Sequence, residues 1–308
     1  MFFSSNALGI EICRDGARFA LLGGKSTAPK LEAFSVVSFP PDTLRFSMRD
    51  ETICNQDAFV AGIRDTYLKL LTKTSRVSVS LPDGLGRVIL LDLDTRFKSR
   101  DEGADIIRWK MKKNFPFDVN ELHLDYQIVQ EKESGEISAL VSLVARKIIL
   151  QFEDCLASAG LQANCIDFTT FNICRLFSSR LEIADNAVLL VNYDSTLSVL
   201  IFNNGLLQFF RSKELPGDPG SANRIYREIN SSLQFYKDRH PGFPLNEVLC
   251  VDVNGDAGTF RSVAAEVTGI EPVFLDADRV ISKSNDVGTD VRAIRSTTGA
   301  VGAAIRNL

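Results

Sequence analysis

The sequence predicts an α/β protein made of two similar lobes. Its first and last parts show the same order of elements, namely three strands, a helix and a fourth strand. Such a repeat is typical of a duplicated unit whose two copies face each other. With 308 residues, of which 45% are hydrophobic and 24% charged, the chain is long enough for two lobes with a sizeable core. A generic α/β protein without internal symmetry is the alternative that the order of elements leaves open.

The first copy begins with a hairpin signal. Two mainly apolar segments flank Arg14-Asp15-Gly16, which has the residue types of a tight turn. Three strands are expected, over Ala7 to Ile12, Ala17 to Leu22 and Leu31 to Phe39. Apolar residues at helical spacing predict a helix over Gln56 to Lys73, and the alternation of apolar residues with serine predicts a fourth strand over Arg76 to Leu81.

An insertion into the first copy is expected over about residues 84–142, as an α+β subdomain. It should contain one amphipathic helix over Asp101 to Asn114 and three strands, over Val88 to Leu93, Leu122 to Gln130 and Ile137 to Val144. A helix over Arg146 to Ala159 follows and should end at Gly160, because glycine tolerates the left-handed turn found there. A strand over Asn164 to Phe168 and a helix over Thr169 to Glu182 come next.

The pattern restarts in the second half of the chain. Three strands are expected, over Ala187 to Val191, Leu197 to Phe202 and Leu206 to Arg211. The last two are joined by Asn203-Asn204-Gly205, a tight-turn signal. A helix, a strand and a second helix follow, over Pro219 to Arg239, Val248 to Val253 and Ala257 to Thr268. Residues 276–292 are polar and expected to be irregular, and a helix of small residues closes the chain.

Composition and missing motifs exclude several classes of function. A net charge of -4 and a pI near 5.4 argue against nucleic-acid binding, which needs a basic face. No apolar run reaches the roughly 18 residues of a membrane helix and no signal peptide is recognisable, so a cytoplasmic location without direct membrane insertion is expected. The six cysteines form no C-x-x-C pair, the two histidines lie far apart, and no metal site is expected. The common P-loop, serine-hydrolase and zinc-protease motifs are absent from the sequence.

A series of short segments resembles the PilM pilus-assembly proteins of the actin-like superfamily. Leu8-Gly9-Ile10-Glu11-Ile12 is similar to the first phosphate loop of that superfamily, and Leu190-Val191-Asn192-Tyr193-Asp194 falls where the second loop begins. Further segments resemble PilM in order along the chain: Ile107 to Lys110, Asn114 to Asp118, Leu124 to Tyr126, Leu143 to Lys147, Ala159 to Leu161, Ile166-Asp167, Glu228 to Tyr236 and Ala300 to Arg306.

This resemblance covers nearly the whole chain and implies a fold. The expectation is an actin-like (ribonuclease H-like) duplicated fold of two lobes, with the inserted α+β subdomain in the first lobe and a reduced second lobe. The first lobe should span residues 1–183 and the second 184–290. Residues 291–308 should form a C-terminal helix that packs back on the first lobe.

The phosphate loops of this chain depart from the pattern of the superfamily. There, an acid at a strand end positions a magnesium ion, and a glycine two residues later lets backbone N–H groups approach the phosphates. This chain keeps an acid, Glu11, but places Cys13 at the glycine position. In the second loop Asn192 replaces the acid and Asp194 stands at the glycine position. A carboxylate about 4 Å from a triphosphate adds a repulsion of order 1–4 kcal/mol, so these substitutions predict weak or absent ATP binding.

The remaining nucleotide contacts are also incomplete. Gly255 and Gly258 resemble the adenosine-side loop, although a plain strand-to-helix turn is the favoured explanation of these glycines. Gly217 resembles one member of the double glycine of the family, but the chain then runs almost directly into the next helix and has no room for the helical subdomain that contacts adenosine. We therefore expect a pseudo-ATPase without a cofactor. The alternatives are a working actin-like ATPase with ATP and magnesium, and a sugar-kinase-like phosphotransferase.

The resemblance also implies a role and a partner. It implies a cytoplasmic adaptor at the inner-membrane platform of a type IV pilus or related secretion machine. The adaptor would hold the cytoplasmic tail of a PilN-like bitopic membrane protein, with other platform proteins as further partners. The tail would be captured along a strand edge or in a shallow apolar groove beside the insertion. Trp109, Phe115 and Phe117 are the aromatic residues of the insertion, and they serve either this contact or the local core.

Overall fold

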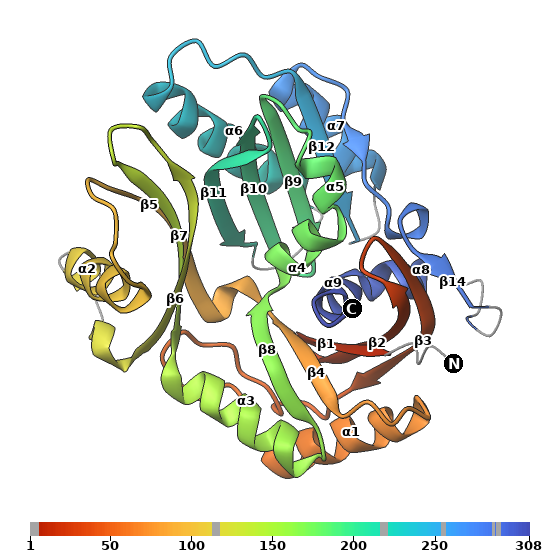
Figure 1. Cartoon of the computed structure of the whole chain (residues 1–308). Coiled ribbons are helices and arrows are strands. Elements are labelled where there is room, and N and C mark those ends of the chain that lie inside the picture. Colours follow the sequence, from red (N-terminus) through yellow and green to blue (C-terminus); the bar gives the residue numbers. More distant parts are fainter. Residues whose placement is uncertain (1–5, 113–117, 216–220, 254–256, 285–286, 288–290) are drawn as a thin grey trace.

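The computed structural model describes residues 6–112, 118–215, 221–253, 257–284, 287 and 291–308. It contains two large mixed β-sheets, one in each lobe, and a smaller third sheet beside them (Figure 1). Helices lie between the two large sheets and on their outer faces.

The first lobe is built on a six-stranded sheet with the order β14-β3-β2-β1-β4-β8. Its strands are β1 (Ala7–Cys13), β2 (Gly16–Lys25), β3 (Ala28–Ser38), β4 (Arg76–Leu81), β8 (Gln162–Phe168) and β14 (Ser282–Lys283). The central strand β1 is antiparallel to β2 and parallel to β4. All seven residues of β1 are buried, and Glu11 is its only charged one.

The second lobe repeats this arrangement with the strand order β11-β10-β9-β12-β13. Its strands are β9 (Ala187–Tyr193), β10 (Thr196–Asn203), β11 (Leu206–Glu214), β12 (Glu247–Asp252) and β13 (Val273–Phe274). β9 takes the place of β1, because it is antiparallel to β10 and parallel to β12. The duplicated order that the sequence predicts is confirmed. It makes β1 and β9 equivalent central strands.

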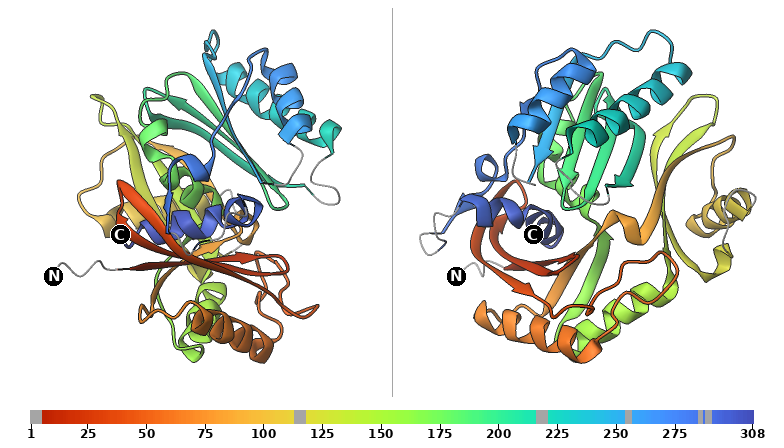
Figure 2. Two further views of the ribbon diagram at one scale, coloured as in Figure 1. Left: turned by 90° about the vertical axis from the view of Figure 1, so that its right-hand side faces the viewer. Right: turned by 180° about the vertical axis from the view of Figure 1, so that it is seen from behind.

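Helices form three layers around the two sheets. α1 (Gln56–Lys69) and α3 (Arg146–Ser158) cover the outer face of the first sheet, and α6 (Ala222–Arg239) and α7 (Ala257–Thr268) cover that of the second (Figure 2). α4 (Thr169–Leu176) and α9 (Thr298–Ile305) lie between the sheets, with α5 (Ser178–Leu181) and α8 (Val291–Ser296) beside them. α9 packs directly on β1 and α4. It can approach closely because a Cβ at Gly302 would lie only 2.0 Å from the carbonyl oxygen of Asn172.

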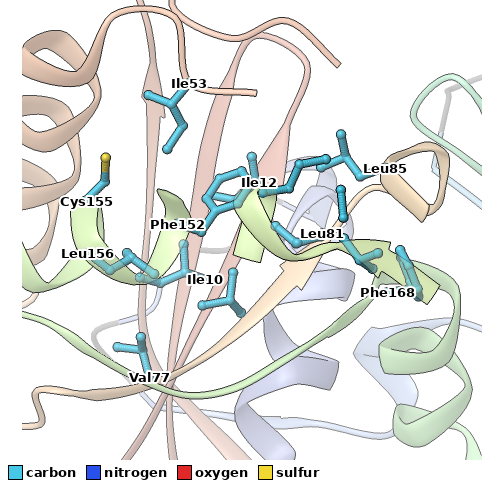
Figure 3. Close-up of a cluster of buried hydrophobic side chains, with 14 of the residues drawn as sticks. Ile10, Ile12, Ile53, Val77, Leu81, Leu85, Phe152, Cys155, Leu156 and Phe168 are labelled. Atoms are coloured by element: carbon cyan, nitrogen blue, oxygen red, sulfur yellow. The ribbon is translucent and has the colours of Figure 1, made fainter. Parts of the chain in front are cut away.

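The core of the first lobe lies between its sheet and the helices α1 and α3. Ile10, Ile12 and Leu81 come from the sheet, and Phe152 and Leu156 come from α3 (Figure 3). All five side chains are at most 1% exposed, and burying each of them stabilises the fold by about 1.5–3 kcal/mol. Successive side chains of β1 and β4 point to opposite faces of the sheet. The side chains on the other face of these strands therefore point toward α9, which lies between the two sheets (Figure 1).

The insertion forms the third sheet, in the order β5-β7-β6. Its strands are β5 (Gly86–Leu93), β6 (Leu122–Glu131) and β7 (Ile137–Ala145). The helix α2 (Arg100–Lys112) buries Ile107 and Met111. β6 is an edge strand, because β7 is its only partner among the described strands.

Three elements differ from the prediction. α1 ends at Lys69 instead of Lys73, because Leu71 adopts a left-handed backbone with φ of +50° and cannot continue the helix. The helix predicted over Thr169 to Glu182 is interrupted at Phe177, whose backbone (φ -103°, ψ 18°) separates α4 from α5. The segment predicted to be irregular contributes β14, which pairs with β3 and extends the first sheet.

Candidate functional site

Glu11 lies at the inner end of β1, where the two lobes meet. Its side chain is only 2% exposed. The hydroxyl of Tyr193, at the end of β9, lies 2.9 Å from Glu11 Oε2, and Arg18 Nη1 lies 3.6 Å from Oε1. Burial raises the pKa of Glu11 to about 7, although Arg18 and the Tyr193 hydroxyl act in the opposite direction. The acid of the first phosphate loop is therefore surrounded by groups of the protein itself.

The hydroxyl of Tyr193 connects Glu11 to the beginning of α9. It accepts a hydrogen bond from the backbone N–H of Gly299 at 3.2 Å, and the carbonyl oxygen of Ser296 lies 2.8 Å away. The hydroxyl has one proton, so it can donate either to this carbonyl or to the carboxylate of Glu11. When Glu11 is protonated it can itself donate to the hydroxyl, which then donates to the carbonyl oxygen of Ser296. The same helix start leaves little space, because a Cβ at Gly299 would lie 2.7 Å from Cδ of Glu11.

Tyr193 is a residue whose role the sequence analysis missed. It lies between Asn192 and Asp194, the two positions that were compared with the second phosphate loop. Its side chain is 4% exposed, and burial raises its pKa well above its ordinary value. The signal available in the sequence is a bulky aromatic residue at a loop where the superfamily needs space for phosphates.

The other predicted residues of the phosphate loops lie around this contact. Cys13 is buried at the end of β1, with its Sγ 4.0 Å from the carbonyl oxygen of Glu11, and burial raises the pKa of its thiol. Asn192 donates a hydrogen bond from Nδ2 to Oδ1 of Asp252 at 3.0 Å, which joins the ends of β9 and β12. Asp194 turns the chain from β9 into β10 with a φ of +53°, a backbone that glycine adopts more readily.

The space left between the loops is small. A cavity of about 50 Å³ lies between Glu11, Tyr193 and Asp194 on one side and Asp83 and Thr170 on the other, and we call it the interlobe cavity. Pockets that enclose small ligands typically measure about 300–1,000 Å³. The interlobe cavity in this conformation is thus far smaller than a nucleotide requires.

Polar contacts hold the lobes together beside the cavity. Thr170 Oγ1 donates to Asp83 Oδ2 at 2.5 Å and lies 2.9 Å from Oγ of Ser198 in the second lobe. Burial raises the pKa of Asp83 to about 6. Arg14 of the first lobe pairs with Glu214 of the second. These contacts join the two lobes on the side of the phosphate loops.

The adenosine side of the site is only partly described. Gly217 and Gly255 lie outside the described residues, and Gly258 is exposed in the first turn of α7. β11 ends at Glu214 and α6 begins at Ala222, so the chain between them is short. The predictions for Gly217, Gly255 and Gly258 stay predictions.

A second and much larger hollow lies between the insertion and the rest of the molecule. It measures about 1040 Å³, and five consecutive residues of β6, Asp125 to Val129, line one wall. The opposite wall comes from α4, α5 and the β10–β11 hairpin, including Phe171 and Leu207. We call this hollow the β6 groove.

The groove borders one face of the third sheet and also the free edge of β6. Successive side chains of a strand point to opposite faces of its sheet, so a hollow over one face touches alternate residues. β7 shows this alternation, because Leu140 and Ser142 line the groove, whereas β6 contributes five residues in a row. β6 has no partner strand on its other side among the described strands, and its lining residues come from both faces of the sheet, so the groove reaches this free edge.

Trp109 lies elsewhere. It is 65% exposed on α2 and is not among the residues that line the β6 groove. Phe115 and Phe117 lie outside the described residues. A contact between these three aromatic residues and a partner therefore stays a prediction.

Two further properties concern the described residues as a group. They contain no cluster of three or more histidine, cysteine, aspartate or glutamate side chains placed to hold a metal ion. None of their helices is both long and apolar enough to cross a membrane.

Comparisons with known proteins identify relatives of this chain. The family model for type IV pilus assembly protein PilM matches residues 9–236. A chain in the structure of the PilM–PilN type IV pilus biogenesis complex is 17% identical, with a TM-score of 0.83 and 98% of each chain covered. The cytoplasmic domain of EpsL, an inner membrane component of the type II secretion system of Vibrio cholerae, is 10% identical, with a TM-score of 0.50 and coverage of 96% of this chain and 94% of that one. A protein with an actin-like ATPase fold from Bacteroides thetaiotaomicron is 13% identical, with a TM-score of 0.49 and coverage of 95% and 96%. No curated protein matches the sequence.

Proposed function

The chain belongs to the family of type IV pilus assembly proteins PilM and has its actin-like fold of two lobes, and on this basis we propose that it is an adaptor without nucleotide chemistry. In this proposal the β6 groove holds an extended cytoplasmic segment of a PilN-like membrane protein. The interlobe cavity binds no ATP, because the protein's own side chains occupy the place of the phosphates.

The edge of β6 is the observation that carries the adaptor role. An edge strand presents unpaired N–H and C=O groups, and an extended peptide can add to it as a further strand. The five consecutive residues from Asp125 to Val129 make such an edge accessible from the groove. The similar chain in the PilM–PilN complex comes from an assembly with PilN, which supports a PilN-like segment as the occupant.

The walls of the groove supply side-chain contacts for the same segment. Apolar residues such as Phe171, Leu206 and Leu207 line it, and a partner gains about 25 cal/mol for each Å² of apolar surface that it covers there, mostly at Leu206, which is 38% exposed. Most charged residues of the groove already have partners. Asp167 pairs with Arg175 at 3.3 Å and with Arg306 at 2.9 Å, and Arg100 pairs with Asp125. Affinity for the segment then comes from backbone hydrogen bonds and apolar contacts more than from charge.

The Glu11–Tyr193 contact supports the loss of ATP binding. For a magnesium ion to use Glu11, the carboxylate would have to leave Tyr193 and the start of α9, and the lobes would have to separate to enlarge a cavity of about 50 Å³. Asp194 would add negative charge beside the phosphates. A sugar-kinase-like phosphotransferase would need the same phosphate site, so no observation favours it.

This role also places the protein in the cell. An adaptor for the cytoplasmic segment of a PilN-like protein works in the cytoplasm and reaches the inner-membrane platform through its partners. Other platform proteins are further candidates for such contacts, since a scaffold of two lobes presents more surface than one segment covers.

The adaptor role is tested by calorimetric titration of the protein with a peptide of the cytoplasmic tail of the PilN-like protein from the same organism. We expect binding in the micromolar range, and we expect N-methylation of alternate peptide bonds to weaken it. In an added strand, every second N–H group of the peptide points to the neighbouring strand. Methylation of that set of N–H groups removes the donors and should lower the affinity at least about tenfold, whereas methylation of the other set should not. Equal affinity of the two methylated peptides would show that the segment does not add to a strand edge.

Matched variants locate the binding site. Ile128 is 42% exposed and lines the groove, so Ile128→Asp should lower the affinity for the peptide by about tenfold or more. Leu150 is 56% exposed on α3, outside the lining of the groove, and Leu150→Asp is the control that should bind normally. If both variants bind like the unmodified protein, the β6 groove is not the site.

A separate titration with ATP and magnesium tests the interlobe cavity. We expect no heat of binding and no change in melting temperature, because a ligand that binds the folded state would raise this temperature. Micromolar binding of ATP would overturn the pseudo-ATPase proposal and leave the peptide result unaffected.

A further inference from the structure

A small exposed surface at the end of α1 combines apolar and basic residues. It comprises residues 68–76, where α1 ends and the chain turns into β4, and we call it the α1–β4 corner. Leu68 is 61% exposed and Leu71 93% exposed. Lys69, Lys73 and Arg76 are also exposed. The corner lies beside the start of β1, because Thr74 Oγ1 donates to the carbonyl oxygen of Asn6 at 3.3 Å.

Leu71 is unfavourable for the isolated protein in two respects. Its φ of +50° puts a side chain with a Cβ into the left-handed region, where helix ends usually carry glycine or asparagine. Its side chain also gains nothing from burial, since almost all of its surface faces water. Leu71 therefore weakens the fold without a compensating contact inside the described chain, which points to a contact outside it.

The charge of the corner indicates the chemistry of that contact. The stretch from Arg64 to Arg76 carries four basic residues and one acid, Asp65, in a protein whose net charge is -4. None of the ion pairs between described residues uses Lys69, Lys73 or Arg76. A basic and apolar surface is complementary to an anionic lipid headgroup layer, with cations at the phosphates and leucines at the acyl boundary.

We propose that the α1–β4 corner contacts an anionic membrane surface. A protein partner is less well matched, because stable protein interfaces bury roughly 800 Å² on each side and two leucines offer only a small part of this. The contact is peripheral and reversible, and it involves no membrane-spanning segment. It is independent of the β6 groove, although together with a membrane-anchored partner it would orient the adaptor and increase its effective concentration at the bilayer.

The test measures binding of the full-length protein to vesicles in the absence of any protein partner. Sedimentation with vesicles of phosphatidylglycerol and phosphatidylcholine should show binding that falls with added salt, and vesicles of phosphatidylcholine alone should bind much less. Each basic residue near an anionic surface increases partitioning roughly fivefold, so the double charge reversal Lys69→Glu, Lys73→Glu should reduce it by at least about 30-fold.

Two controls separate this effect from unfolding and from net charge. Leu71→Gly suits the left-handed backbone, so it should keep or raise thermal stability while it lowers partitioning several-fold. The double variant Lys147→Glu, Lys237→Glu changes net charge equally at exposed sites on α3 and α6 and should lower partitioning much less than the corner variant. Absence of binding to anionic vesicles, equal binding to neutral vesicles, or equal losses in the two double variants would overturn the proposal.

Discussion

Replacing Glu11 with glutamine tests the electrostatics of the contact between the lobes. Glutamine has nearly the same shape, and its oxygen can still accept a hydrogen bond from Tyr193, but it does not titrate. Arg18 stays charged between pH 4 and 9, so in this variant it faces a neutral side chain at every pH, as it does in the unmodified protein when Glu11 is protonated. The absolute stability of Glu11→Gln is therefore not diagnostic, whereas the pH dependence of its stability is.

The size and sign of the effect follow from the pKa of Glu11. Its pKa is about 7 in the folded protein against 4.5 for an ordinary glutamate, so folding favours the protonated acid. The stabilisation is fully present below pH 4.5 and is lost as the pH rises through 7. The difference of about 2.5 pKa units corresponds to about 3 kcal/mol. The unfolding free energy of Glu11→Gln minus that of the unmodified protein should therefore rise by about 3 kcal/mol as the pH increases from 4.5 to 8.

Urea denaturation followed by circular dichroism at a series of pH values measures this difference. Asp83 and the other titrating groups contribute equally to both proteins and cancel in the comparison. Glu153→Gln, at an exposed position on α3, is the matched control and should run parallel to the unmodified protein. If the curve of Glu11→Gln is also parallel to it, Glu11 titrates like an exposed acid and the reasoning about the buried contact is wrong.

Three other substitutions test the packing between the lobes. Tyr193→Phe removes the hydroxyl that faces Glu11. Urea denaturation should show a loss of about 1–3 kcal/mol of unfolding free energy, and the titration of Glu11 should move to higher pH. An unchanged titration would contradict the contact. Thr170→Val removes the hydroxyl between Asp83 and Ser198, and a loss of about 1–3 kcal/mol at neutral pH is expected; unchanged stability would show that these groups find other partners. Gly302→Ala places a Cβ 2.0 Å from a backbone oxygen of α4 and should lower the unfolding free energy by about 1–3 kcal/mol. The control Gly84→Ala, whose Cβ meets nothing within 4 Å, should leave the unfolding free energy unchanged. Equal stability of the two variants would refute the close packing of α9.

Much of the fold could be predicted from the sequence because its signals are local. Short apolar runs that end at turn residues predict β1 and β9, and the repeated order of elements predicts two equivalent lobes. Gly160 and Gly205 adopt the positive φ values of +85° and +72° that their positions as helix and hairpin turns imply. Leu71 marks a limit of such signals, because its apolar side chain fits the helical pattern and only the backbone shows that α1 has already ended.

The candidate site depends instead on contacts that no local pattern encodes. The sequence by itself determined that Glu11 is an acid at the end of a buried strand and that Cys13, Asn192 and Asp194 depart from the phosphate-loop pattern. Only the tertiary structure placed Tyr193, which is 182 positions away, against Glu11, and only it brought the edge of β6 beside the second lobe. The physical reason is that strand and turn preferences arise between neighbours along the chain, whereas these contacts arise from the packing of two complete sheets around α4 and α9.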